Sequence, residues 1–267
     1  MIFTPVAPGR WTTFAGPEWN RPGGGLWGGY AIGACIRVLE AEPEALGEAL
    51  SLTLTYASGL TSGALDIRTR RLRQGGSIGV WEVELVPAGS DQVGVHAIVT
   101  MARRPATPTF AFAKMPDVPA PESLPSPSPG SPVGVTRYAA TPLEWRTVEG
   151  FPPRPGAHSR SRAWVRSPGA PLDKALLGMI TDNSPARALY ALGAAVMTTT
   201  LTLTVYLHAT AAQVAEVGND FVLVEYEGRV GGGGASDERS TYWTRDGKLL
   251  ATSEQLAWYR PRAPQSA

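Results

Sequence analysis

Two short runs decide the fold of this chain: Leu52-Thr-Leu-Thr-Tyr56 and Leu201-Thr-Leu-Thr-Val-Tyr206. Each run alternates apolar residues with threonine, which is typical of a strand that has one buried face. Each run also follows a segment with apolar residues at helical spacing, 28–40 in the first case and roughly 172–192 in the second. The recurrence predicts that a unit of one helix followed by strands occurs twice.

After each run the chain alternates again and is interrupted by turn residues. The predicted strands are 65–73, 77–87 and 93–102 in the first half, and 221–230, 240–244 and 249–258 in the second. Turn signals at 74–76, 89–91, 231–234 and Asp246-Gly247 separate them. Because Asp-Gly between two alternating runs favours a hairpin, we expect antiparallel sheets in both halves.

A proline-rich stretch separates the halves, densest in 119–130. Proline at this density favours an extended connection and cannot enter a central strand. We therefore predict a first unit at 1–105, a crossover linker at 106–136 and a second unit at 137–264.

Composition excludes several classes of protein. Of 267 residues, 54 are glycine or proline, which excludes a helical bundle, and the formal net charge of +1 gives no basic surface for nucleic acid. The single cysteine, Cys35, forms no internal disulfide or structural zinc site. No apolar run is long enough for a membrane span, and residues 1–11 lack the features of a leader. A cytoplasmic protein without metal or cofactor is expected.

Two strings match known catalytic or cofactor-binding motifs but lack the secondary structure that these motifs require. Gly23-x-Gly25-x-x-Gly28 opens a helix but lacks the buried strand that a dinucleotide fingerprint needs before it. Gly75-x-Ser77-x-Gly79 precedes an alternating strand, whereas a nucleophile elbow precedes a helix. We interpret both as structural, and the three histidines offer no triad partner.

Polar residues in the second half form a more informative set. Asp182 follows a helical pattern, Thr198-Thr-Thr200 opens a strand, and Gln255 lies in the last strand on the face of Ala251 and Ser253. Singly, each has an ordinary explanation as a helix cap, a strand former or a solvated side chain. Together, a carboxylate, a hydroxyl and an amide have the chemistry to orient and deprotonate a water.

The order of these features resembles the acyl-CoA thioesterase II family. The resemblance rests on Trp27-Gly-Gly-Tyr30, on Asp182, on Thr200 at the head of the strand ending Tyr206-Leu-His208, and on the string from Asp246 to Gln255. It implies an α+β double hotdog fold, in which each of two tandem units has a curled antiparallel sheet wrapped around a central helix.

The resemblance also implies a site and a reaction. Asp182, Thr200 and Gln255 would hold a water that attacks the thioester of acyl-CoA, releasing a free acid and CoA in lipid metabolism. Thr199 and Thr202 remain rivals of Thr200. Backbone N–H groups of Gly28 and Gly29 are candidates for stabilising the oxyanion. An apolar tunnel between the units would take the acyl chain.

Other interpretations stay open at this point. Arg70, Arg71 and Arg73 either meet CoA phosphates or form a solvated strand edge. The alternative functions are a non-catalytic hotdog protein that binds acyl groups, and a hotdog hydratase or dehydratase. The latter is raised by Asp91 and His96, five residues apart. A homodimer is expected by analogy with the family.

Overall fold

The computed structural model describes residues 1–267 except 22–23, 126–142, 152, 157, 194–195 and 262–267. The first half contains β1 (Phe3–Ala7), β2 (Arg10–Ala15), α1 (Gly28–Ala41), β3 (Glu48–Tyr56), β4 (Gly63–Gln74), β5 (Ile78–Pro87) and β6 (Val95–Ala102). The second half contains β7 (Glu144–Glu149), β8 (Ser161–Arg166), α2 (Lys174–Ile180), α3 (Ala188–Leu192), β9 (Val196–Leu207), α4 (Ala211–Ala215), β10 (Val222–Glu227), β11 (Gly231–Gly232), β12 (Ala235–Trp243) and β13 (Leu249–Pro261).

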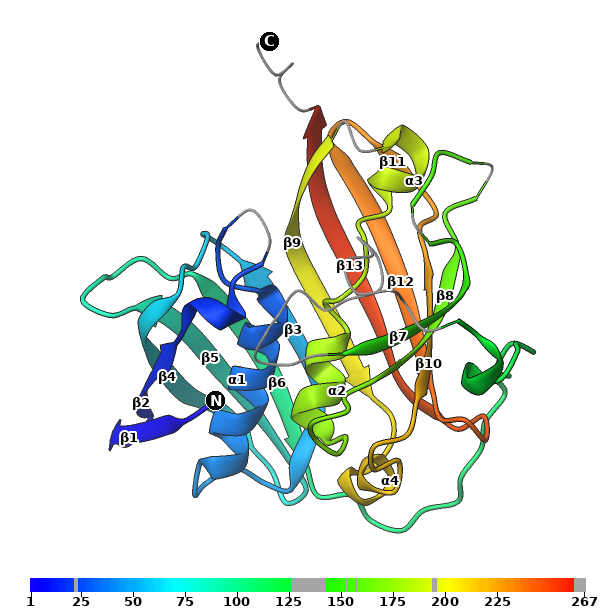
Figure 1. Ribbon diagram of the computed structural model, residues 1–267. Coiled ribbons are helices and arrows are strands. Elements are labelled where there is room, and N and C mark those ends of the chain that lie inside the picture. Colours follow the sequence, from blue (N-terminus) through cyan, green and yellow to red (C-terminus); the bar gives the residue numbers. More distant parts are fainter. Residues whose placement is uncertain (22–23, 126–142, 152, 157, 194–195, 262–267) are drawn as a thin grey trace.

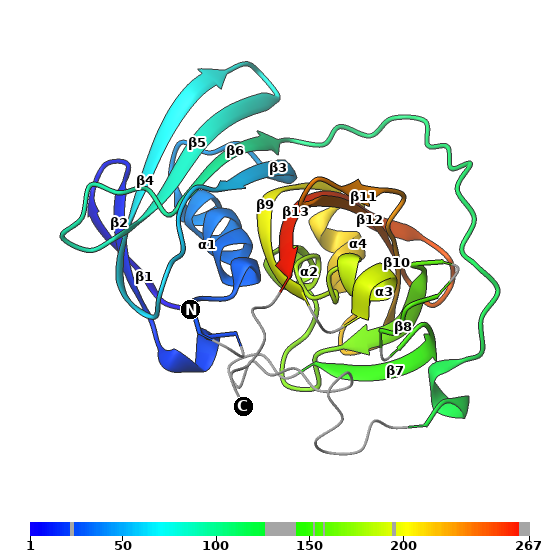
Figure 2. The same ribbon diagram turned by 90° about the horizontal axis from the view of Figure 1, so that it is seen from above.

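One antiparallel sheet runs through both halves in the order β1-β2-β4-β5-β6-β3-β9-β13-β12-β10-β8-β7. Its centre is the pairing of β3 with β9, where Thr53 lies opposite Thr204 and Leu54 opposite Leu203. The two runs that reveal the repeat are therefore hydrogen-bonded to each other. Seen from above, each half of the sheet curls around its own helix, α1 on one side and α2 on the other (Figure 2). This is the double hotdog fold that the sequence predicts.

The two central helices pack side by side in opposite directions (Figure 1). Small residues allow the close approach: a Cβ on Gly33 would lie 2.8 Å from the Met179 side chain, and one on Gly178 would lie 2.9 Å from Ile32 and Ile36. Contacts this short leave no room for a larger residue in a close-packed core. A Cβ on Gly29 would likewise lie 2.8 Å from the Met179 carbonyl oxygen, so the first turn of α1 lies beside the last turn of α2.

At the opposite end of the helix pair, charged residues join the two halves. Arg37 on α1 forms an ion pair with Asp173, the N-cap of α2. The buried Lys174 donates from Nζ to the Ala49 carbonyl at 2.8 Å and lies 3.5 Å from Glu48. We call this group of five residues the clasp. Because the charges of the clasp are paired across the halves, they hold the two units in register at this end.

The described part of the chain between the halves, residues 103–125, runs around the outside of the second half (Figure 2). It covers a small apolar cluster on the outer face of the sheet, made of Trp164, Phe221, Leu223 and Trp243. Trp164 Nε1 donates to the Pro119 carbonyl at 2.9 Å, and Met115 packs on the cluster. Residues 115–124 are thus packed against the second half, whereas residues 105–114 are exposed.

One expectation about secondary structure is wrong, and four strands were not predicted. The single helix at 172–192 is two short helices, because Thr181 caps α2 and the turn that follows contains Pro185, which cannot continue a helix. The strands that were not predicted are β1 and β2, which precede α1, and β7 and β8, which precede α2. They are short strands at the ends of the sheet, where the alternation is weak. The unit boundaries stay a prediction, and residues 126–136 and 262–264 lie outside the described residues.

Candidate functional site

A pocket of about 440 Å³ opens between the two halves, at the end of the helix pair opposite the clasp. The first half contributes Arg21, Leu26, Trp27, Gly28, Ala31, residues 56–60 and Val95. The second half contributes Asp182, Ser184, Ala186, residues 198–201, Gln255 and Ala257. Four of the five predicted site residues thus line one pocket, and Gly29 is adjacent in α1.

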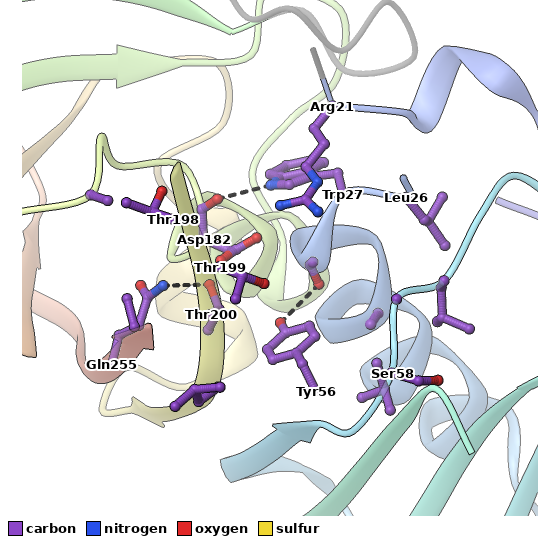
Figure 3. Close-up of a pocket in the computed structure, with 18 of the residues that line it drawn as sticks. Arg21, Leu26, Trp27, Tyr56, Ser58, Asp182, Thr198, Thr199, Thr200 and Gln255 are labelled. Atoms are coloured by element: carbon purple, nitrogen blue, oxygen red, sulfur yellow. Dashed lines mark hydrogen bonds between the residues drawn. The ribbon is translucent and has the colours of Figure 1, made fainter. Parts of the chain in front are cut away.

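Asp182 reaches this pocket because α2 ends just before it. The Thr181 hydroxyl donates to the Gly178 carbonyl at 2.7 Å, which closes the last turn of the helix. Trp27 Nε1 from the first half then donates to the Asp182 carbonyl at 2.8 Å. These bonds fix the backbone of Asp182, whose side chain faces the same pocket as the Thr200–Gln255 pair and Tyr56 (Figure 3).

The Asp182 carboxyl lies against the first turn of α1. A Cβ on Gly28 would come within 2.6 Å of Asp182 Oδ2 and within 2.9 Å of the Tyr56 hydroxyl. That hydroxyl donates to the Gly28 carbonyl at 3.1 Å. Glycine at this position therefore lets a carboxylate approach a helix N-terminus, where backbone N–H groups are not used inside the helix.

The pKa of Asp182 is raised from 3.8 to about 7, and burial is the largest cause. The nearby charge of Glu238 contributes to this rise. The backbone N–H of Gly29 and the positive charge of Arg21 act in the opposite direction and favour the ionised carboxylate. A carboxyl group with a pKa near 7 is suited to accept a proton at neutral pH.

Thr200 and Gln255 come from the adjacent strands β9 and β13. Gln255 Nε2 donates to Thr200 Oγ1 at 2.6 Å (Figure 3). The register shifts here, since Leu256 lies opposite Thr202 but Ala257 lies opposite Thr200, leaving one extra residue in β9. Of the rival threonines, Thr199 also lines the pocket and Thr202 does not.

Comparison with protein families identifies both halves. Residues 15–102 match the acyl-CoA thioesterase N-terminal domain, and residues 113–259 match the acyl-CoA thioesterase C-terminal domain. The chain belongs to the acyl-CoA thioesterase family. It is therefore a thioester hydrolase with an acyl-CoA substrate. A search of curated proteins finds no match.

Solved structures share the fold of this thioesterase at low sequence identity. A hotdog-fold protein of unknown function from Alicyclobacillus acidocaldarius is 23% identical, with a TM-score of 0.89 over 98% of this chain and 97% of the other. The tesB protein of Mycobacterium avium subspecies paratuberculosis is 18% identical, with a TM-score of 0.77 over 97% and 96%. Acyl-CoA thioesterase II TesB2 of Mycobacterium marinum is 18% identical, with a TM-score of 0.74 over 98% and 97%.

The thioesterase pocket includes functional groups that the sequence analysis missed. Arg21 reaches it from a loop before α1, where no periodic pattern marks it. Ser184 lines it and donates to the buried Glu238, which pairs with Arg187 Nε at 2.7 Å. A buried Arg–Glu pair is visible only in the fold, because its members come from a loop and from a strand.

Other predicted candidates lie elsewhere in the thioesterase. Arg70 pairs with Glu82 and Arg71 with Glu44, and neither these arginines nor Arg73 line the pocket. Asp91 and His96, the pair expected of a hydratase, do not line it either. His96 Nε2 lies 2.9 Å from Glu82 Oε1 on β5.

The string Gly75-x-Ser77-x-Gly79 forms the hairpin between β4 and β5, as predicted. Among the residues that the structure describes, no group of His, Cys, Asp or Glu side chains has the arrangement of a metal site. None of the helices described is both long and apolar enough to cross a bilayer.

Proposed function

We propose that this thioesterase hydrolyses acyl-CoA by direct attack of a water on the thioester carbonyl carbon, with Asp182 as general base. The observation that carries the proposal is that the Asp182 carboxyl lies against the first turn of α1 and shares one pocket with the hydrogen-bonded Thr200–Gln255 pair. A base, a hydrogen-bonding pair and the first residue of α1 thus face the same pocket.

Thr200 and Gln255 hold the water, and Asp182 takes its proton as the new C–O bond forms. The negative charge moves to the carbonyl oxygen, where the N–H of Gly28 stabilises it. The C–S bond then breaks, the proton passes from Asp182 to the CoA sulfur, and a free acid and CoA leave.

The two glycines at the helix start take different roles in this proposal. The N–H of Gly29 already favours the ionised Asp182 carboxylate. Gly28 lines the pocket, so its N–H is the one we assign to the oxyanion. Neither role requires a metal or an organic cofactor, and a covalent acyl-enzyme is not part of the scheme.

Turnover of a panel of acyl-CoAs, followed with a reagent for free thiols, tests the assignment of Asp182. Asp182→Asn should lower kcat by roughly 10²–10⁴-fold, the usual contribution of a general base. Circular dichroism and thermal unfolding verify that the variant is folded. A folded Asp182→Asn protein with the wild-type rate would show that Asp182 is not the base.

A single turnover in water labelled with heavy oxygen separates direct attack from covalent catalysis. Direct attack places the label in the released acid during the first turnover. Attack by the Asp182 carboxylate itself would form an anhydride, and hydrolysis at its Asp182 carbonyl would leave the label in Asp182 and an unlabelled enzyme oxygen in the first acid released. Label found in Asp182 by peptide mass spectrometry would overturn the proposed mechanism.

The predicted homodimer and the cytoplasmic location remain proposals. Light scattering of the purified protein measures the number of chains in the assembly, and a mass of one chain would contradict the homodimer.

A further inference from the structure

The pocket has an apolar wall opposite its polar side. The wall residues are Leu26, Ala31, Ala57, Leu60 and Val95, all from the first half. In Figure 3, Leu26 and Ser58 lie across the pocket from Gln255. An acyl chain whose thioester carbon is next to Asp182 is most stable against this wall, because burial of apolar surface favours binding.

Backbone hydrogen bonds fix the turn that forms this wall. The N–H groups of Ala57 and Ser58 both donate to the Gly94 carbonyl, at 2.9 and 3.1 Å. The Leu26 N–H donates to the Leu60 carbonyl at 2.8 Å, which joins the turn to the loop before α1. Because backbone hydrogen bonds hold both ends of this turn, it keeps its conformation when an acyl chain binds against it.

Leu60 fills the space above Gly94. A Cβ on Gly94 would lie 2.1 Å from Leu60 Cδ2 and 2.5 Å from its Cγ, and the other close atom is also in the Leu60 side chain. Gly94 is not among the glycines with positive φ, so its backbone accepts other residues. The side chain of Leu60, which is 7% exposed, is therefore the reason for glycine at this position.

We propose that Leu60, resting on Gly94, is the end wall of the acyl subsite and limits the enzyme to compact acyl groups. A volume of about 440 Å³ supports this size class, because small-molecule pockets span roughly 300–1,000 Å³ and this one must also hold the thioester and the water. The inference rests on the proposed function, and the substrate class is short acyl thioesters.

Two substitutions at this contact should shift specificity in opposite directions. Leu60→Ala opens the space over Gly94, so the ratio of kcat/KM for dodecanoyl-CoA to that for hexanoyl-CoA should rise at least about tenfold. Gly94→Ala pushes Leu60 into the pocket, so activity should fall for hexanoyl-CoA relative to acetyl-CoA by a similar factor. Unchanged ratios in both variants would overturn the inference.

Leu65→Ala is the matched control. Leu65 is also a buried leucine of the first half, 1% exposed, and it does not line the pocket. It should lower stability without altering the order of substrates. Should Leu60→Ala fail to fold, Leu60→Val gives a smaller shift in the same direction, and an equal shift in Leu65→Ala would contradict the special role of Leu60.

Binding measurements separate this inference from the proposed function. Alkyl-CoA thioethers resemble the substrate but cannot be hydrolysed, so their dissociation constants are measurable in the Asp182→Asn background. In that background, Leu60→Ala should lower the dissociation constant of dodecyl-CoA relative to that of hexyl-CoA. If wild-type protein hydrolyses no acyl-CoA, the proposed function fails, while the order of thioether affinities still supports or overturns the subsite.

Discussion

Glu238 and Gln255 lie directly opposite each other on β12 and β13. The buried ion pair of Glu238 with Arg187 is therefore one strand away from the proposed water site. Arg187 is also surrounded by aromatic rings, at 4.4 Å from the centre of Tyr190 and 5.5 Å from that of Tyr226. Its environment leaves the guanidinium dependent on Glu238 for charge compensation.

Removal of one partner of this pair should destabilise the fold. Glu238→Gln leaves the Arg187 charge buried without a carboxylate, which costs about 3–5 kcal/mol in comparable pairs. Denaturant unfolding measures the loss. The double variant Arg187→Met, Glu238→Leu should lose less free energy of unfolding than Arg187→Met or Glu238→Leu alone, because no buried charge remains. Equal losses in the single and double variants would contradict this account.

The pKa of Asp182 predicts the pH dependence of activity. The base must be ionised, so kcat/KM should rise with pH and level off above about 7. Glu238→Gln removes a negative charge that raises this pKa, so its profile should move to lower pH. A flat profile from pH 5 to 9 in the wild type would argue against a base with this pKa.

The same shift should be visible in stability. Between the unfolded pKa of 3.8 and the folded value of about 7, the folded state holds a proton that the unfolded state has lost. Stability should therefore fall as pH rises through this range. At pH 8, Asp182→Asn should be more stable than the wild type by roughly 2–4 kcal/mol, with no difference below pH 3. Urea unfolding at several pH values checks both the sign and the range.

Gly28 offers a steric test with a control in the same pocket. Gly28→Ala places a methyl group 2.6 Å from Asp182 Oδ2, which displaces the carboxylate and should lower kcat by about a hundredfold. Gly59 also lines the pocket, but a Cβ there meets nothing within 4 Å. Gly59→Ala should keep most of the activity, and equal losses in the two variants would contradict the steric argument.

The threonines of β9 allow a matched comparison within one strand. Thr200→Val removes the hydroxyl that accepts the Gln255 hydrogen bond and should lower kcat by about a hundredfold. Thr200→Ser retains the hydroxyl and should recover most of the rate. Thr202→Val removes a hydroxyl outside the pocket and should have little effect, and the reverse order would point to Thr202.

Local patterns predict the inner elements of this fold well. Helix α1 starts at Gly28 as expected, and β13 turns Ala251 and Ser253 inward and Glu254 outward as its alternation predicts. Such elements have one buried face, so their periodicity is strong. The terminal strand β1 is mostly exposed, and its sequence lacks that signal.

Contacts between segments that are distant in the sequence could not be predicted from local patterns. The sequence shows that 52–56 and 201–206 are alike, but it does not show that these strands pair, since register is set by the packing of whole sheets. The residues that complete the pocket, such as Tyr56, Leu60 and Arg21, lie at a strand end or in loops, where position depends on contacts with distant segments.

The two ends of the α1–α2 pair differ, although the two units have the same plan. One end has the pocket with Gly28 and Asp182, and the other is closed by the clasp around Arg37 and Lys174. In an assembly of two identical chains, every substitution occurs at both symmetry-related places. Because both units here belong to one chain, each substitution occurs once. A single chain can therefore devote one end of the helix pair to chemistry and the other to holding the halves together.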